Sequence, residues 1–158
     1  MTASDAPDPI TAIADAIRDL QRLRSSRRVH AALADATGVD LSQQAVQVLG
    51  ALDETRPVAQ LARAARMDVG AVSRQLRTLE DAGYVTKTPS PDNASVVLVA
   101  ATRRGREVAA RIAASRNDHL ARAVERWSAT DRAALAALLR RLVDDLQATP
   151  YRDEAPAA

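Results

Sequence analysis

The stretch that decides the fold is residues 67–105, MDVGAVSRQLRTLEDAGYVTKTPSPDNASVVLVAATRRG. Its first half predicts a helix, because Val72, Leu76 and Leu79 recur at helical spacing and build one apolar stripe. Asp68 stands where it can cap the first turn of that helix. The helix therefore has a buried side, and the polar residues between the stripe positions face away from it.

The second half predicts a β-hairpin. Gly83 provides the left-handed stop that helices commonly use at their C-terminal end. Two runs with strand composition follow, Tyr84–Thr88 and Val96–Ala101, and the polar segment 89–93 forms the turn between them. The order helix, strand, polar tip, strand, helix is that of a winged helix-turn-helix.

The polar side of the predicted helix carries hydroxyl, guanidinium and amide groups, which are the side chains that bind phosphates and base edges. They are Ser73, Arg74, Gln75, Arg77 and Thr78. Arginine and glutamine make paired hydrogen bonds to guanine and adenine respectively, whereas the two hydroxyls suit phosphate. The alternatives are an ion pair from Arg77 to Asp81, four residues on, and simple solvation of Arg74.

Helical segments flank this unit on both sides. One long helix is expected over residues 8–35, and Ser42 can cap a second helix that carries Ala45–Leu52. Pro57 opens a short helix over Val58–Ala65, and residues 66–67 form the tight turn that follows.

Two further helices are expected on the C-terminal side. Thr102 can cap a helix that reaches about Trp127. Ser128 and Asp131 resemble a capping box for a last helix that Pro150 ends. The fold class is mainly α with a small β-hairpin wing (α+β): a winged helix-turn-helix over 41–105, and a helical dimerisation layer from 9–40 and 106–150. Residues 1–8 and 151–158 are expected to be a disordered N-terminus and a flexible tail.

Composition argues against several functional classes. Hydrophobic residues make up 47% of the 158 residues, which is ample for a core, but aromatics make up only 2%. The absence of cysteine excludes disulfides and thiolate metal sites. His30 and His119 lie far apart, and no catalytic triad spacing, glycine-rich phosphate loop or paired-carboxylate pattern occurs, so we expect no enzyme, cofactor or metal. No apolar run reaches about 18 residues and no signal peptide is evident, which favours a cytoplasmic protein without a membrane partner.

Charge is concentrated in the middle of the chain. The formal net charge is only +2. Residues 56–106, however, carry nine cationic and four anionic side chains, a net +5, which leaves −3 for the rest. A basic segment between near-neutral to acidic flanks is typical of a nucleic-acid-binding module, although a solvated arginine-rich surface would have the same composition.

The chain resembles the MarR family of bacterial transcription regulators over residues 41–146. The resemblance rests on LSQQAVQVL (41–49), on Leu61-Ala62, on DVGAVSRQLRTLEDAGYV (68–85), on Pro91-Asp92 and on TRRG (102–105). It implies a homodimer in which the first and last helices form the dimerisation layer. It further implies a repressor that binds a pseudo-palindromic double-stranded DNA operator and is released by a small ligand. A monomeric helical bundle that hides the same apolar surface internally is the alternative.

The hairpin tip departs from the family pattern. Members typically carry Asp-x-Arg there, but Asp92 is followed by Asn93 and Ala94. Lys87 and Asn93 are the candidates left for contacts from the wing, and Arg66 in the preceding turn could bind phosphate or form a salt bridge. The missing arginine predicts a shallower minor-groove contact, with specificity dominated by the recognition helix.

A ligand pocket is expected where the first helix, the helix capped by Ser42 and the helix capped by Thr102 meet the winged domain. Its candidate lining residues are Arg24, Arg28, His30 and Trp127. The scarcity of aromatic residues favours an aliphatic or anionic ligand over a stacked phenolic one. Two functions stay open: a ligand-responsive dimeric DNA-binding regulator, or a winged-helix dimer that acts as a protein-interaction module and binds DNA weakly or not at all.

Overall fold

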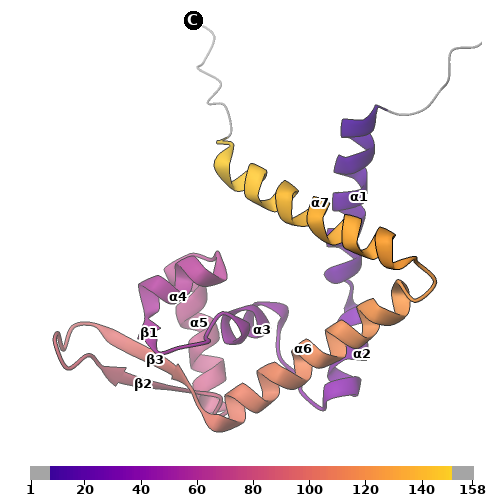
Figure 1. Ribbon diagram of the computed structural model, residues 1–158. Helices are drawn as coiled ribbons and strands as arrows, with labels where there is room; N and C mark the ends of the chain where they lie inside the picture. Colours follow the sequence, from indigo (N-terminus) through magenta and orange to yellow (C-terminus); the bar gives the residue numbers. More distant parts are fainter. Residues whose placement is uncertain (1–7, 151–158) are drawn as a thin grey trace, which may run out of the picture. The chain divides into compact units, whose positions relative to one another are not determined.

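The computed structural model describes residues 8–150 (Figure 1). Its helices are α1 (Pro9–Arg24), α2 (Arg27–Thr37), α3 (Gln43–Gly50), α4 (Val58–Ala65), α5 (Val69–Asp81), α6 (Arg103–Ala123) and α7 (Ala129–Ala148). Its strands are β1 (Arg56–Pro57), β2 (Val85–Pro89) and β3 (Val97–Ala101). The chain divides into two compact units, Met1–Arg116 and Asn117–Ala158. The architecture is mainly α with a small antiparallel sheet, as the sequence predicted.

The core of the first unit lies among α3, α4, α5, the sheet and the first half of α6. Leu61, Val72, Leu79 and Val99 are fully buried there, and Val108 of α6 is 1% exposed. These aliphatic side chains pack without Phe or Trp, because the helices approach through small residues such as Ala45, Ala62 and Ala65. The core holds α4 and α5 as a helix-turn-helix with the hairpin directly after it.

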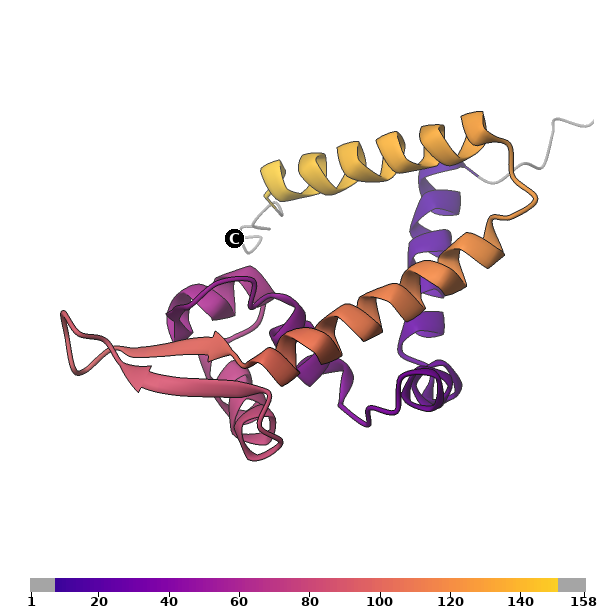
Figure 2. The same ribbon diagram turned by 60° about the horizontal axis from the view of Figure 1, so that its bottom comes forward.

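The sheet has the strand order β1-β3-β2, with both pairs antiparallel. Val85 lies opposite Ala101 in the hairpin, and Arg56 lies opposite Val99 on the other edge. The two-residue β1 was not predicted, because so short a strand has no detectable alternation. The hairpin projects away from the helices (Figure 2). The loop lies one residue later than expected, because β2 runs on to Pro89 and β3 begins at Val97. The Ser90 N–H donates to the Val96 carbonyl at 2.8 Å across the base of this loop.

The predicted helix caps are confirmed. The Asp68 carboxylate accepts from the Ala71 N–H at 2.7 Å at the start of α5. Ser42 accepts from the Ala45 N–H, and Thr102 from the Gly105 N–H, both at 3.0 Å. Gly83 has φ +73°, the left-handed conformation expected of it. These local signals set the boundaries of the helices in the winged region.

The single long helix expected over 8–35 is wrong. The chain forms α1 and α2, separated at Ser25 and Ser26. Ser25 Oγ donates to the Gln21 carbonyl, and Ser26 Oγ accepts from the Val29 N–H at 3.3 Å. Adjacent serines satisfy the backbone groups that a helix break exposes, so they favour a stop and a restart even though the apolar spacing continues.

The helix expected to reach Trp127 also ends early, at Ala123. A turn follows, in which the Trp127 N–H donates to the Val124 carbonyl at 3.0 Å. Ser128 then has extended backbone angles and accepts from the Asp131 N–H at 3.0 Å, so α7 begins with the predicted cap. The turn is needed because the residue that caps a helix cannot itself continue the preceding one.

The terminal helices keep apolar side chains exposed. Ile10 is 71% exposed and Leu23 59% on α1, and Leu138 is 63% exposed on α7. Neither helix has a buried residue. Within residues 8–150, no helix combines the length and apolar content that crossing a membrane requires. The predicted disordered segments lie outside the described residues, except Asp8, whose side chain caps α1 by accepting from the Thr11 N–H at 3.1 Å.

Candidate functional site

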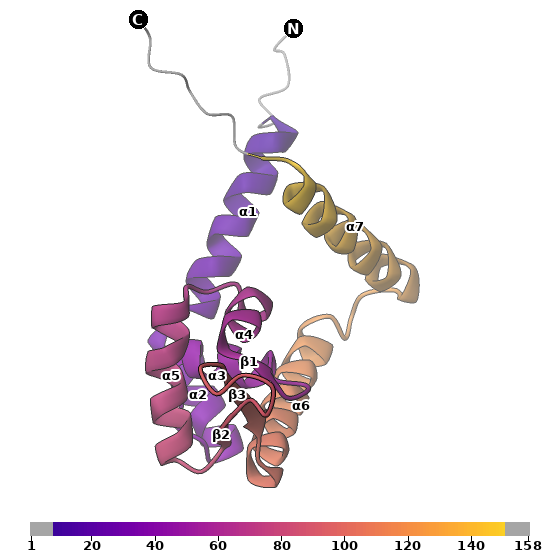
Figure 3. The same ribbon diagram turned by 90° about the vertical axis from the view of Figure 1, so that its left-hand side faces the viewer.

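Helix α5 has one buried side and one exposed polar side. Val72, Leu76 and Leu79 are at most 1% exposed and fix the rotation of the helix against α3 and α4. We define the polar face of α5 by the residues predicted to contact DNA, which are Ser73, Arg74, Gln75, Arg77 and Thr78. All of them are exposed except Gln75, which is half-buried. Viewed from the side of the hairpin, α5 lies on one side of it and the first turns of α6 on the other (Figure 3).

Two arginines of the polar face have no ion pair within residues 8–150. Neither Arg74 nor Arg77 has an acidic partner there, and the expected alternative of an Arg77–Asp81 pair does not form. Arg66, in the turn before α5, is likewise exposed and lacks an acidic partner in that range. Its φ of +52° lets the chain reverse between α4 and α5. These guanidiniums keep their donors available for an anion.

Gln75 is engaged with a neighbouring helix. Its Oε1 accepts from Ser42 Oγ at 3.0 Å, and its Nε2 donates to Gln44 Oε1 at 3.1 Å. Ser42 and Gln44 lie at the start of α3, more than thirty residues earlier in the chain. The sequence predicted Ser42 only as a helix cap and indicated no role for Gln44, because nothing in a local pattern shows that the start of α3 meets the middle of α5.

The structure gives both predicted wing residues partners inside the chain. Lys87 on β2 pairs with Glu80 of α5, with Nζ and Oε2 2.6 Å apart. Asn93 accepts from the Ser95 N–H at 3.0 Å through its side chain and from the Val96 N–H at 2.8 Å through its carbonyl. Lys87 therefore braces the hairpin against α5, and Asn93 shapes the tip.

The remaining cations of the basic segment are divided among several roles. Arg56 pairs with Asp53 and Glu54, and Arg103 pairs with Glu107. The Arg104 guanidinium lies 5.1 Å from the centre of the Tyr84 ring, a cation–π contact. The net +5 of residues 56–106 thus overstates the charge available to a partner. The arginines without an ion pair are concentrated around α4 and α5 instead.

The residues predicted to line a ligand pocket do not line the two cavities that the structure shows best. His30 Nε2 lies 2.8 Å from the Leu41 carbonyl, a contact that joins α2 to the segment before α3. Arg24 and Arg28 are exposed, and Trp127 is 44% exposed and belongs to the second unit. None of the four lines either of the two cavities described next.

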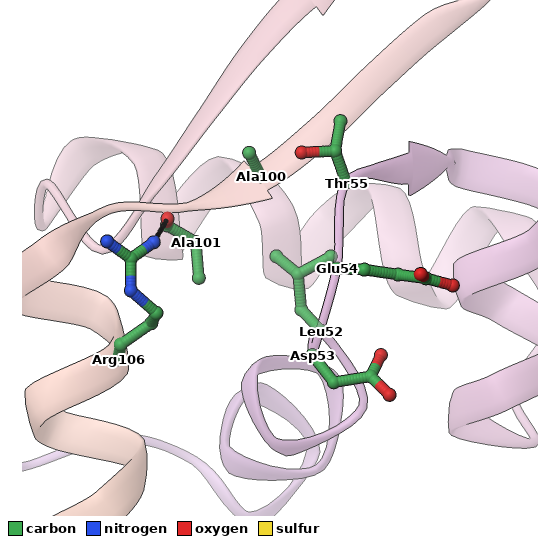
Figure 4. A pocket seen from close by; sticks show the side chains of 7 residues that line it. All are labelled: Leu52, Asp53, Glu54, Thr55, Ala100, Ala101 and Arg106. Atoms are coloured by element: carbon green, nitrogen blue, oxygen red, sulfur yellow. Dashed lines mark hydrogen bonds between the residues drawn. The ribbon is translucent and has the colours of Figure 1, made fainter.

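The larger cavity has a volume of about 230 Å³ and lies beside the sheet (Figure 4). Leu52–Thr55 form one wall, and Ala100, Ala101 and Arg106 form the other. Arg106 closes part of this space by donating to the Ala101 carbonyl at 2.7 Å. Asp53 and Glu54 balance the positive charges of Arg56 and Arg106 around this cavity. The cavity therefore favours neither an anionic nor a cationic ligand.

A smaller cavity of about 70 Å³ lies between α3 and α6, lined by apolar side chains and by Arg116. Burial lowers the pKa of Arg116, and the like charge of Arg24 lowers it further. The guanidinium stays protonated at neutral pH, because its ordinary value is far above 7. Of these two arginines, Arg116 lines the apolar cavity and Arg24 does not.

No three potential metal ligands come together within the described part of the chain. What the structure does present is a helix-turn-helix with an exposed recognition-type helix, followed by a β-hairpin. This arrangement is a winged helix-turn-helix.

Comparisons with known proteins agree with this class. The model of the MarR family matches residues 32–94. Further solved MarR-family proteins share the fold. Over residues 32–94 the chain is therefore similar to the MarR family, and its fold is that of the winged helix-turn-helix proteins of this family. No curated protein matches it.

Three solved structures illustrate the likeness. A probable transcriptional regulator from Pseudomonas aeruginosa is 26% identical, over 76% of this chain and 92% of that one, with a TM-score of 0.61. PcaV from Streptomyces coelicolor, solved with its natural ligand, is 18% identical over 91% and 98%, with a TM-score of 0.63. FabT from Streptococcus pneumoniae, solved with DNA, is 19% identical over 87% and 92%, with a TM-score of 0.62.

Proposed function

We propose that the protein is a dimeric, sequence-specific DNA-binding transcriptional regulator, a repressor that a small ligand releases from its operator. The observation that carries the proposal is the polar face of α5. Arg74 and Arg77 are exposed there and have no ion pair within residues 8–150. The opposite side of the helix is anchored in the core. A helix held in this way can enter the major groove.

The roles of the individual residues follow from their chemistry. Arg74 and Arg77 suit the paired acceptors of guanine, while Ser73 and Thr78 suit phosphate oxygens. Arg66 is exposed at the turn before the recognition helix, and we expect it to bind the DNA backbone there. FabT, which shares this fold, was solved with DNA, and that supports the assignment.

The dimer is proposed from the exposed apolar surface of the terminal helices. Ile10, Leu23 and Leu138 are each more than half exposed. A two-fold dimer would cover these side chains and would present two recognition helices to the two halves of a pseudo-palindromic operator. Dimerisation would thus add affinity and would require the operator to be symmetric.

The proposal includes a small-molecule effector. PcaV was solved with its natural ligand, so this fold can hold one. Arg116 lines the apolar cavity between α3 and α6, and its guanidinium is a suitable partner for a carboxylate there. Arg24 was among the predicted lining residues. An anionic ligand with an aliphatic part fits this site better than a planar phenol, and a crystal soak that placed a planar aromatic ligand between the layers would contradict it.

A second function is favoured by the wing. Lys87 is paired with Glu80, Asn93 is used in the tip, and Ala94 stands at the family's arginine position. A winged-helix dimer with such a wing could bind a protein instead of DNA. An apolar protein interface would respond weakly to salt, whereas DNA binding through phosphates falls steeply as salt rises.

The test is binding of the purified protein to the DNA just upstream of its own gene, across a salt series, with scrambled DNA for comparison. We expect the wild type to bind this DNA selectively and in a salt-sensitive way. The Arg74→Ala variant should bind it with about 5- to 150-fold lower affinity, because one paired arginine–guanine contact contributes that much discrimination. Arg111→Ala, which removes an exposed arginine from α6, should change binding little. Equal binding to scrambled DNA, or none, would favour the protein-interaction module.

A further inference from the structure

Gln75 differs from the rest of the polar face of α5. Within residues 8–150, the side chain of Gln75 makes hydrogen bonds to another helix, and the other side chains of this face do not. Its Oε1 accepts from Ser42 Oγ at 3.0 Å, and its Nε2 donates to Gln44 Oε1 at 3.1 Å. Both ends of the amide are therefore held, and the rotation of the group about its last bond is fixed.

The two holding bonds leave half of the amide's capacity unused. A glutamine amide offers two lone pairs on oxygen and two N–H groups on nitrogen. One lone pair and one N–H are used on Ser42 and Gln44, so one acceptor site and one donor site are left over. In the major groove, adenine presents one N–H donor at N6 and one acceptor at N7. The unused sites match adenine in number and kind.

We infer that Gln44 and Ser42 are positioning residues that orient Gln75 to read one adenine in each operator half-site. The inference rests on the proposed DNA-binding function and adds to it the base that Gln75 selects. A free glutamine side chain must lose rotamer freedom when it binds a base. Here much of that ordering is already present in the folded protein, which raises the discrimination that one amide can achieve.

Gln44 is the better of the two residues to change. Ser42 also caps α3 by accepting from the Ala45 N–H, so its removal would disturb the helix itself. Gln44 is exposed at the second position of α3 and contributes one acceptor to Gln75. Gln44→Ala removes that acceptor, whereas Gln44→Glu keeps it. Gln43→Ala is the matched control, because Gln43 is the exposed neighbour at the same helix end.

The experiment selects binding sites for the full-length protein from a randomised duplex DNA library and compares base preferences between variants. The wild type should require adenine at one position of each half-site, and Gln75→Ala should lose that requirement by roughly 5- to 150-fold. Gln44→Ala should reduce the preference for adenine by about 2- to 10-fold, which is the effect of one hydrogen bond. Gln44→Glu should keep the preference while binding all DNA more weakly, since it adds negative charge near phosphate. Gln43→Ala should resemble the wild type.

Substitution of the selected adenine by 7-deazaadenine, which lacks the N7 acceptor, gives a second readout. The wild type should lose affinity, Gln75→Ala should lose none, and Gln44→Ala should lose less than the wild type. A purely structural role for Gln44 would lower affinity for every sequence equally and leave this difference unchanged.

The outcomes separate the inference from the function on which it depends. Selective binding by the wild type, with unchanged base preference in Gln44→Ala, would overturn the positioning role and leave the regulator intact. Selective binding in which Gln75→Ala alters a base other than adenine would overturn the assignment of adenine. No sequence-selective binding by the wild type would overturn both the inference and the proposed regulator.

Discussion

At the scale of single residues, Gly105 shows how closely the hairpin and α6 approach. A Cβ built on Gly105 would lie 2.9 Å from the carbonyl carbon of Tyr84. Thr102 holds the same junction, because its Oγ donates to the Gly83 carbonyl at 2.8 Å and its N–H donates to the Tyr84 carbonyl at 3.0 Å. The backbone cannot move away without breaking these bonds, so only glycine fits here.

We therefore expect Gly105→Ala to lower the free energy of unfolding by about 1–3 kcal/mol, the cost of forcing extra atoms into a packed site. Urea denaturation at a fixed protomer concentration measures it. Gly50→Ala is the control, since nothing lies within 4 Å of a Cβ there, and alanine should leave stability unchanged or raise it by up to about 1 kcal/mol. Equal unfolding midpoints for the two variants would refute the close approach.

Exposed residues of the site were predictable from the sequence, but their partners within the chain were not. Residue type and helical spacing were enough to predict that Arg74 and Arg77 are exposed. They could not show that Lys87 pairs with Glu80, or that Gln75 meets Ser42 and Gln44, because those partners are distant along the chain. A side chain's availability depends on its neighbours in space, which composition does not reveal.

At the scale of elements, the caps explain why most boundaries were predictable. Side-chain caps act within three residues, so a serine, threonine or aspartate before an apolar run marks a helix start directly. The break between α1 and α2 follows the same rule, because Ser26 caps α2. It was not predicted, because the apolar spacing continues across the break. Short β1 was missed because its pairing partner, β3, lies some forty residues later.

The cap of α5 provides a prediction at this scale. Asp68→Ala removes the acceptor for the Ala71 N–H, so we expect a loss of about 0.5–2 kcal/mol in the free energy of unfolding. Asp68→Asn keeps a side-chain oxygen and should lose much less. Denaturant unfolding of the three proteins side by side measures the difference. If alanine and asparagine were equally destabilising, charge rather than capping would explain the effect.

At the scale of the whole molecule, the terminal helices matter most. The apolar residues of α7 recur along one side of the helix, and Leu138 and Leu139 on that side are exposed. Within the second unit nothing described buries them. An exposed apolar stripe of this kind indicates an interface with another chain.

We expect the wild type to be a dimer and Leu138→Arg to be a monomer, because a charge placed in an apolar interface is costly. Sedimentation velocity at micromolar protein measures the mass. Ala137→Arg, which adds the same charge about half a helical turn away from the stripe, should stay dimeric. A monomeric wild type, or identical masses for both variants, would count against the proposed dimer.

The sequence by itself determined the fold class, the caps and the amphipathic faces of the winged region. These features depend on interactions within a few residues and on periodicities of 3.6 and 2, which can be read from the chain directly. It also determined which side of α5 is polar, and with it the candidate DNA-contacting residues.

Only the tertiary structure decided which polar groups are available and which are engaged inside the chain. Lys87 meets Glu80, Asn93 shapes the hairpin tip, and Gln75 is held by the start of α3. It also decided that Gly105 must be glycine. These outcomes depend on pairs of residues that the packing of α3, α5 and the hairpin brings together, and no local pattern in the sequence specifies such pairs.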